Sequence, residues 1–146
     1  MADPIAHRLH DQPCFALYTT VQAIQRAYRP LLEPIGLTYP QYVVMLSLWE
    51  RDGVSVVELS RRTTLDSPML TPILKRLQQK GLIARTRNAA DERKLVVTLT
   101  EAGRALQRDA WDIPARMVCE VGLSEEDQRV LHRLCTGIQQ SLGSGR

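Results

Sequence analysis

The chain has 146 residues, of which 44% are hydrophobic and 24% charged, with a formal net charge of +3. This composition fits one ordinary globular domain, and no apolar run approaches the roughly 18 residues that a membrane-spanning helix needs. The first residues lack the basic and then apolar layout of a signal peptide, so we expect a cytoplasmic protein without a membrane partner. Three widely spaced cysteines favour neither structural zinc nor a disulfide framework, and His7, His10 and His132 lack ligand spacing. No metal or cofactor is therefore expected.

The charge is unevenly distributed along the chain. Between Val54 and Thr100, nine basic residues stand against four acidic ones, a net +5, whereas the remainder has a net −2. A basic segment is typical of a nucleic-acid partner, although a merely solvated face is an equal explanation on charge alone. The order of the helices and strands in this segment decides between a nucleic-acid-binding surface and a solvated face.

The first expected element is a long amphipathic helix from Asp11 to about Leu32, with apolar residues spaced three and four apart. Pro13 suits the first helical position, because its missing N–H would be unpaired there, and Cys14 then lies in the first turn. A break containing Pro and Gly follows. Thr38 and Gln41 have the spacing of a capping box, which begins a second helix that runs to about residue 51.

The basic segment is expected to fold as two helices and a β-hairpin. Ser55 and Glu58 repeat the capping-box spacing before a short helix, and a tight connection leads to a second helix between Asp66 and Gly81. Two partly β-branched runs, 82–87 and 94–99, flank a polar loop at 88–93. This order is typical of a winged helix-turn-helix, which makes the fold mainly α with a small β-hairpin. A plain surface hairpin is the alternative.

In such a fold the second helix enters the major groove of double-stranded DNA. Arg93, at the hairpin tip, suits a narrow minor groove, where negative potential attracts a guanidinium, and Asp91 is expected to hold that side chain. The candidate DNA-binding residues are Ser67, Thr71, Lys75, Arg76, Arg85, Asp91 and Arg93.

The C-terminal part is expected to form two helices. Thr100 caps a long helix that includes Trp111 and Met117, and Ser124 with Asp127 opens the last one. The apolar stripes of the first and the last two helices exceed what one small subunit buries, so we expect a homodimer. The expected organisation is a single domain over 1–146, with the winged helix at about 54–100 and dimerisation helices at about 11–32 and 101–142.

Two sets of residues resemble a known family. The run 82–100, with Asp91-Glu92-Arg93 followed by strand residues and Leu-Thr-Glu-Ala-Gly, is similar to the wing and following helix of the MarR family of dimeric bacterial repressors. The second set resembles the organic hydroperoxide resistance regulators (OhrR) within that family: Asp11-Gln-Pro-Cys-Phe-Ala-Leu-Tyr18, Tyr28, Thr38-Tyr-Pro-Gln-Tyr42 and Leu65-Asp-Ser67. Pro68 and Met69 depart from the glycine and small polar residue common in the family, so base contacts are not carried over there.

The resemblance implies that Cys14 senses organic hydroperoxides. A thiol reacts with a peroxide as the thiolate, which the unpaired N–H groups of a first helical turn favour. By resemblance, Tyr28 and Tyr39 support this thiol by hydrogen bonds, with a tyrosine crossing from the partner subunit, and Tyr18 shares the helical face of Cys14.

The other two cysteines differ in what they imply. Cys119 matches the resolving cysteine of two-cysteine members, which implies a disulfide with Cys14 of the other subunit and a thiol reductant that resets the dimer. Cys135 lies among apolar residues and is expected to be an inert core thiol.

The expected function is a non-enzymatic repressor that binds operator DNA when reduced and releases it when an organic hydroperoxide oxidises Cys14. A single-cysteine route without Cys119 stays open. A MarR-type repressor released by a small phenolic ligand would use the same DNA-binding residues. A thiol peroxidase would also need an activated Cys14, but the basic segment argues against an enzyme. Without the family resemblance, Cys14 and the tyrosines are as well explained as packing residues.

Overall fold

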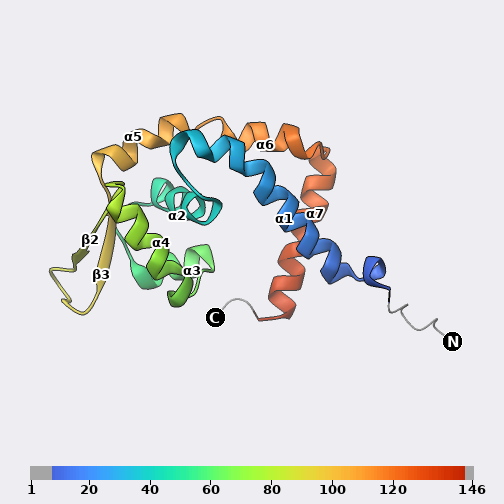
Figure 1. Ribbon diagram of the computed structural model, residues 1–146. Coiled ribbons are helices and arrows are strands. Elements are labelled where there is room, and N and C mark those ends of the chain that lie inside the picture. The colour runs from blue at the N-terminus through green and yellow to red at the C-terminus, as the bar shows by residue number, and fades with distance from the viewer. Residues whose placement is uncertain (1–7, 144–146) are drawn as a thin grey trace.

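The computed structural model of the chain describes residues 8–143, which form two lobes (Figure 1). One lobe contains the short helices and the sheet, and the other contains the long helices of both ends of the chain. The elements in chain order are η1 (Leu9–Asp11), α1 (Pro13–Leu32), η2 (Glu33–Ile35), α2 (Tyr39–Glu50), β1 (Val54–Ser55), α3 (Val56–Thr63), α4 (Ser67–Gln79), β2 (Ile83–Arg87), β3 (Leu95–Leu99), α5 (Glu101–Asp109), α6 (Ile113–Val121) and α7 (Glu125–Ser141).

The expected fold class is confirmed. The described residues are mostly helical, and β2 and β3 form the antiparallel hairpin of a winged helix, with Ile83 opposite Leu99 and Arg87 opposite Leu95. The two-residue strand β1 adds a third strand that the sequence did not predict, with Val54 opposite Val97. A strand of two residues is too short to show the alternation of apolar and polar residues by which strands are recognised in a sequence.

Local capping explains where most helices begin. Both bonds of the Thr38–Gln41 capping box are present at α2. At α3 only half of the expected box forms: the Ser55 hydroxyl accepts from the Glu58 N–H at 3.1 Å, whereas the Glu58 carboxylate pairs with Arg61.

The single long helix expected after Thr100 is wrong, because α5 ends at Asp109 and α6 begins at Ile113. Pro114 favours the break, because it has no N–H to donate to the Ala110 carbonyl and suits the first turn of a new helix, α6. Ala110 and Ile113 are both buried at the break. The break therefore separates α5, which packs against the winged-helix lobe, from α6, which packs against α1.

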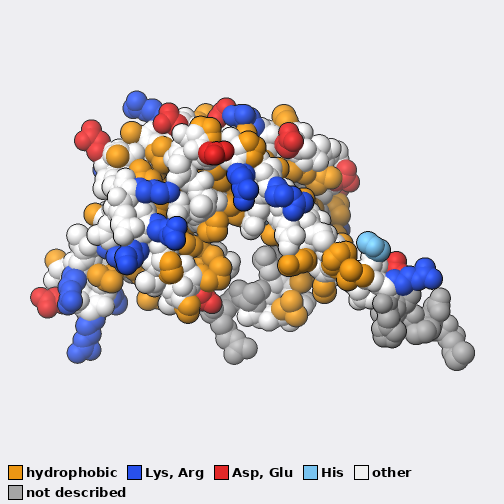
Figure 2. All heavy atoms as spheres, in the orientation of Figure 1, with side chains coloured by type: hydrophobic (Ala, Val, Ile, Leu, Met, Phe, Trp, Pro, Cys, Tyr) orange, Lys and Arg blue, Asp and Glu red, His pale blue; other side chains and the backbone are white. Residues whose placement is uncertain are grey.

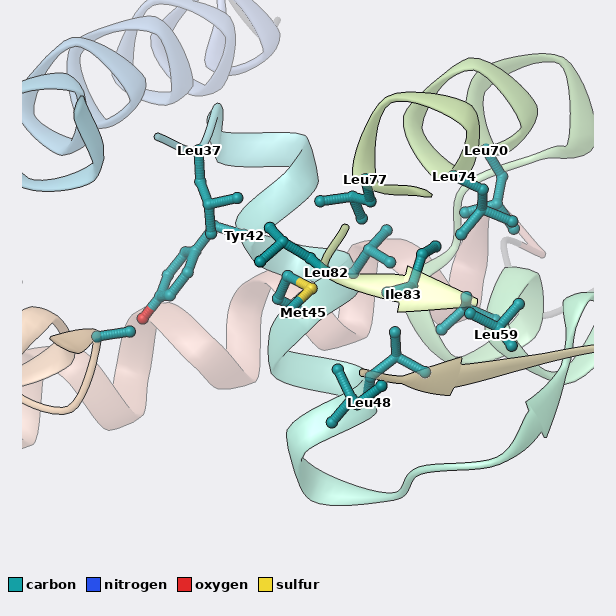
Figure 3. Close-up of a cluster of buried hydrophobic side chains, with 14 of the residues drawn as sticks. Leu37, Tyr42, Met45, Leu48, Leu59, Leu70, Leu74, Leu77, Leu82 and Ile83 are labelled. Carbon is teal, nitrogen blue, oxygen red and sulfur yellow. The ribbon is translucent and has the colours of Figure 1, made fainter. Parts of the chain in front are cut away.

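The core of the winged-helix lobe is built around α2. Figure 3 shows side chains from three elements converging on this helix: Met45 and Leu48 of α2, Leu59 of α3, and Leu70, Leu74 and Leu77 of α4. All six are almost completely buried. This packing fixes the orientation of α4, so its opposite face is held toward solvent.

Asp52 ties three elements together at the base of the wing, a role that the sequence did not reveal. Its carboxylate accepts hydrogen bonds from the N–H groups of Gly53 and Leu99, both at 2.8 Å, and from Arg104 at 2.9 Å. Burial raises the pKa of Asp52, but these hydrogen bonds and the Arg104 charge outweigh burial, so the pKa lies below its usual value.

Candidate DNA-contact surface and redox site

Helix α4 presents the polar face expected of a recognition helix. Ser67, Thr71, Lys75 and Arg76 are all exposed, on the side of α4 away from the buried leucines. The Asp66 carboxylate caps the helix by accepting from the Met69 N–H at 3.0 Å. The Thr71 hydroxyl donates to the Ser67 carbonyl at 2.8 Å, so its proton is already used within the helix.

Five of the nine basic side chains counted in the sequence make contacts with other groups: Arg85 and Lys94 in the wing, and Arg61, Arg62 and Lys80 elsewhere. Arg61 pairs with Glu58 at 2.7 Å, and Arg62 pairs with Glu50 at 2.8 Å. The Lys80 ammonium donates to the Gly36 carbonyl and to Gln41, and burial followed by the Arg76 charge lowers the pKa of Lys80.

The other four of these nine side chains make no ion pair or side-chain hydrogen bond within residues 8–143, and they lie on α4 and the wing. They are Lys75, Arg76, Arg87 and Arg93. Lys and Arg side chains gather on the wing and the adjoining part of this lobe in Figure 2. Arg87, exposed at the end of β2, was not singled out from the sequence, because only its position in the strand distinguishes it from the other arginines.

In the wing, the expected contact between Asp91 and the Arg93 side chain is wrong. The Asp91 carboxylate instead accepts from the Arg93 backbone N–H at 3.1 Å and lies 3.9 Å from the Lys94 ammonium. Asp91 therefore shapes the turn and leaves the Arg93 guanidinium exposed. Arg85 donates to Gln78 at 2.7 Å, which ties β2 to α4.

Cys14 lies in the first turn of α1 and is exposed, so the core of a single chain does not account for it. Tyr18, one turn further along, is 63% exposed. His10 packs its ring edge against Phe15, with centroids 5.9 Å apart, which agrees with a packing role. Within the described residues no cluster of side chains could hold a metal ion, and His7 lies outside them.

Tyr28 and Tyr39 lie together, but at the other end of α1 from Cys14. Their ring centroids are 4.7 Å apart, and Tyr42 follows at 5.8 Å from Tyr28. Burial, and then the neighbouring Tyr39, raises the pKa of Tyr28. Burial, followed by Tyr28 and Tyr39, raises the pKa of Tyr42 to about 12. At neutral pH the Tyr28 and Tyr42 hydroxyls are therefore protonated and able to donate hydrogen bonds.

Cys14 cannot reach these tyrosines within one chain. Cys14 and Tyr28 belong to the same continuous helix, and at 1.5 Å per residue their backbones are about 21 Å apart. Cys119, on α6, is exposed and lines a pocket with Ala27 and Leu31, at the same end of α1 as Tyr28. A disulfide needs Cα atoms within about 7 Å, so this arrangement excludes a Cys14–Cys119 bond inside one chain.

The terminal helices leave a large apolar surface uncovered. Exposed apolar side chains lie on α1, α6 and α7: Tyr18, Val21, Val118, Val121, Leu131, Leu134 and Ile138. Helix α7 has no fully buried residue, and Cys135 is only partly buried, so the expectation of a core thiol is wrong for the single chain. So many exposed apolar side chains on these helices are typical of a protein–protein interface.

Two helices packed on α2 and followed by a basic hairpin define a winged helix-turn-helix protein, and comparisons with known proteins extend this assignment. A family model described as transcriptional regulator SarA/Rot matches residues 26–109. The organic hydroperoxide resistance transcriptional regulator of Bacillus subtilis is 41% identical over 127 residues, which cover 87% of this chain and 84% of that protein.

Two solved structures of AbfR, a Staphylococcus epidermidis protein, are also similar. Reduced AbfR bound to DNA matches with a TM-score of 0.77 and 32% identity over 91% of this chain and 93% of that one. Disulfide-formed AbfR matches with a TM-score of 0.64 and 34% identity over 90% and 93%.

The chain therefore belongs to the SarA/Rot-type, MarR-like family of transcriptional regulators. Members of this family are regulators rather than enzymes, as the basic segment had indicated. No helix in the described part of the chain is long and apolar enough to cross a membrane.

Proposed function

We propose that this protein is a homodimeric repressor that binds operator DNA when Cys14 is reduced and releases it when an organic hydroperoxide oxidises Cys14. The observation that carries the proposal is the exposed thiol in the first turn of α1. The similarity to an organic hydroperoxide resistance regulator supports the choice of oxidant. The test is a gel shift of the reduced dimer on DNA from upstream of its own gene, with and without cumene hydroperoxide.

The sensing site is shared between two subunits. Since Cys14 cannot reach Tyr28, Tyr39 or Cys119 of its own chain, these groups can surround it only from the partner. The exposed apolar faces of α1, α6 and α7 supply the surface that would join the two chains. Tyr28 and Tyr39 then donate hydrogen bonds to the partner's Cys14 or to the bound peroxide, while Tyr18 lines the site from the chain that contributes the thiol.

The chemistry proceeds in two steps. The Cys14 thiolate attacks one peroxide oxygen; the S–O bond forms, the O–O bond breaks, and the alkoxide takes a proton and leaves as the alcohol. The resulting sulfenic acid is attacked by the Cys119 thiolate of the other subunit; the S–S bond forms and the S–O bond breaks with loss of water. A thiol reductant returns both sulfurs to thiols.

DNA binding uses residues 54–100, with α4 in the major groove and the wing beside it. Ser67, Thr71, Lys75 and Arg76 contact DNA from α4, and Arg93 contacts it from the wing tip, while Arg85 and Asp91 hold the wing in place. The similarity to reduced AbfR bound to DNA supports DNA binding by the reduced protein.

The break between α5 and α6 is the joint at which a disulfide would shift the two lobes. It divides the C-terminal part of the proposed dimerisation region, 101–142, between α5, which packs against the winged-helix lobe, and α6, which packs against α1. A small change at the interface could thereby separate the two α4 helices from their half-sites.

Arg93→Ala should weaken operator binding without changing peroxide reactivity. Its exposed guanidinium makes no ion pair within residues 8–143, so its removal should cost about tenfold in affinity and lower the salt slope by about 2 per dimer. Fluorescence-anisotropy titrations at several salt concentrations measure both quantities. Arg108→Ala is the matched control, because Arg108 is exposed on α5, and its operator affinity and salt slope should equal those of the wild type. An unchanged affinity for Arg93→Ala would remove the wing tip from the interface.

Tyr28→Phe and Tyr39→Phe should each slow oxidation of Cys14 about tenfold or more, because a hydrogen bond to a charged group contributes about 1.5–3 kcal/mol. Phenylalanine keeps the packed ring and removes only the donor. Stopped-flow measurement of thiol loss gives the rate. Tyr42→Phe is the control: its hydroxyl is buried and makes no hydrogen bond within the described residues. Wild-type rates in both variants would refute the role of the tyrosine pair.

A further inference from the structure

We infer that α4 recognises thymine through an apolar surface at its N-terminal end, formed by Met69 with Pro68 and Pro72. These side chains would contact the 5-methyl groups of thymines in the major groove, with Met69 as the main determinant. The inference rests on the proposed function, since it requires α4 to lie in that groove.

Met69 is an exposed hydrophobic residue that neither the core nor the apolar surface of the terminal helices explains. Its side chain is 54% exposed, whereas the next residue, Leu70, is completely buried. Its own backbone is fixed, because its N–H donates to the Asp66 carboxylate at 3.0 Å. The side chain is therefore held in solvent by an ordered turn of the helix that faces DNA in the proposed complex.

The neighbouring positions extend this apolar surface. Pro68 and Pro72 are both exposed and lie four residues apart, which places them on one face of α4 and away from Leu70 and Leu74. Neither proline has a donor. The Thr71 hydroxyl already donates its hydrogen bond to the Ser67 carbonyl, at 2.8 Å. In the first turn and a half, only the Ser67 hydroxyl remains as a side-chain donor for a base.

In the major groove, the bases present hydrogen-bond donors and acceptors, and thymine alone also presents an apolar group, its 5-methyl. A surface of methionine and proline therefore complements thymine and leaves a guanine or cytosine edge without partners. One turn further along α4, the exposed Lys75 and Arg76 make no ion pair within residues 8–143, so they can bind phosphates and hold the apolar turn against the bases.

Deoxyuridine provides the test, because it keeps the pairing and the groove acceptors of thymine and lacks only the methyl group. The reduced full-length protein first selects a duplex from a randomised library. The selected duplex is then synthesised with single thymine-to-deoxyuridine changes. Wild type should lose about fourfold in affinity for each contacted methyl, at one or two positions in each half-site.

Met69→Ala should bind the selected duplex more weakly and no longer distinguish thymine from deoxyuridine at its position. Gln79→Ala, exposed near the C-terminal end of α4, is the matched control and should keep the discrimination. Equal melting temperatures show that both variants fold.

Two results would overturn the inference alone: wild type insensitive to deoxyuridine at every position, or Met69→Ala as discriminating as wild type. Failure to enrich any sequence would overturn the proposed DNA-binding function together with it.

Discussion

Cys14→Ser should bind operator DNA like the wild type and should no longer release it when cumene hydroperoxide is added. Serine nearly preserves the size of the side chain, and Cys14 lies in α1, far along the chain from the proposed DNA-binding segment. The hydroxyl cannot form a sulfenic acid or a disulfide, so the loss of peroxide response should be complete. Gel shifts over a range of peroxide concentrations measure this directly.

Cys135→Ser is the matched control for this variant, because it removes a thiol that the proposed chemistry does not use. It should respond to peroxide like the wild type. Continued release of DNA by Cys14→Ser on addition of peroxide would contradict the assignment of the sensing thiol. Release of Cys14→Ser by a small phenolic compound, with no peroxide effect on the wild type, would favour the ligand-controlled alternative.

Gly103→Ala should destabilise the fold by about 3 kcal/mol, the cost of forcing a side chain into a filled space. A Cβ atom at this position would lie 2.0 Å from the carbonyl oxygen of Leu82 and 3.1 Å from its carbon. Both backbones are held in place. The Leu82 carbonyl accepts from the Thr100 N–H at 3.1 Å, and the Gly103 carbonyl accepts from the Trp49 indole at 2.8 Å.

Urea denaturation at one fixed protein concentration measures the effect, since the stability of a dimer depends on concentration. Ala102→Gly, at an exposed position in the same turn of α5, is the control. It measures the effect of helix propensity without a steric clash and should lower the free energy of unfolding by about 1 kcal/mol. If Gly103→Ala cost no more than this control, the close approach of α5 to Leu82 would be wrong.

The parts of the fold that the sequence predicted are those set by local signals. The Thr38–Gln41 spacing marked the start of α2, and the β-branched runs marked the hairpin, because caps and strand periodicity depend on nearby residues. Pro114 is a local signal for the start of α6, but the apolar pattern continues through the break and hides it.

Other features depend on contacts between distant segments and could not be predicted. Asp52 bonds to Leu99 and Arg104, far along the chain, and no pattern around residue 52 reveals this. The residue types of the redox site are apparent from Cys14, Tyr28 and Tyr39, but their separation in space depends on α1 being one unbroken helix, which residue types alone do not show. That separation makes an arrangement within one chain impossible.

The central claim, a sensing site shared between two subunits, is tested most directly with a mixed dimer. A tagged Cys14→Ser chain is co-expressed with an untagged Cys119→Ser chain, both also carrying Cys135→Ser, and the mixed dimer is purified and treated with cumene hydroperoxide. Only one Cys14 and one Cys119 then remain, on different chains. We expect non-reducing electrophoresis to show one covalent band containing both chains, which a reductant removes, and no such band from either homodimer. A mixed dimer that stays unlinked while the wild type forms disulfide would contradict the shared site.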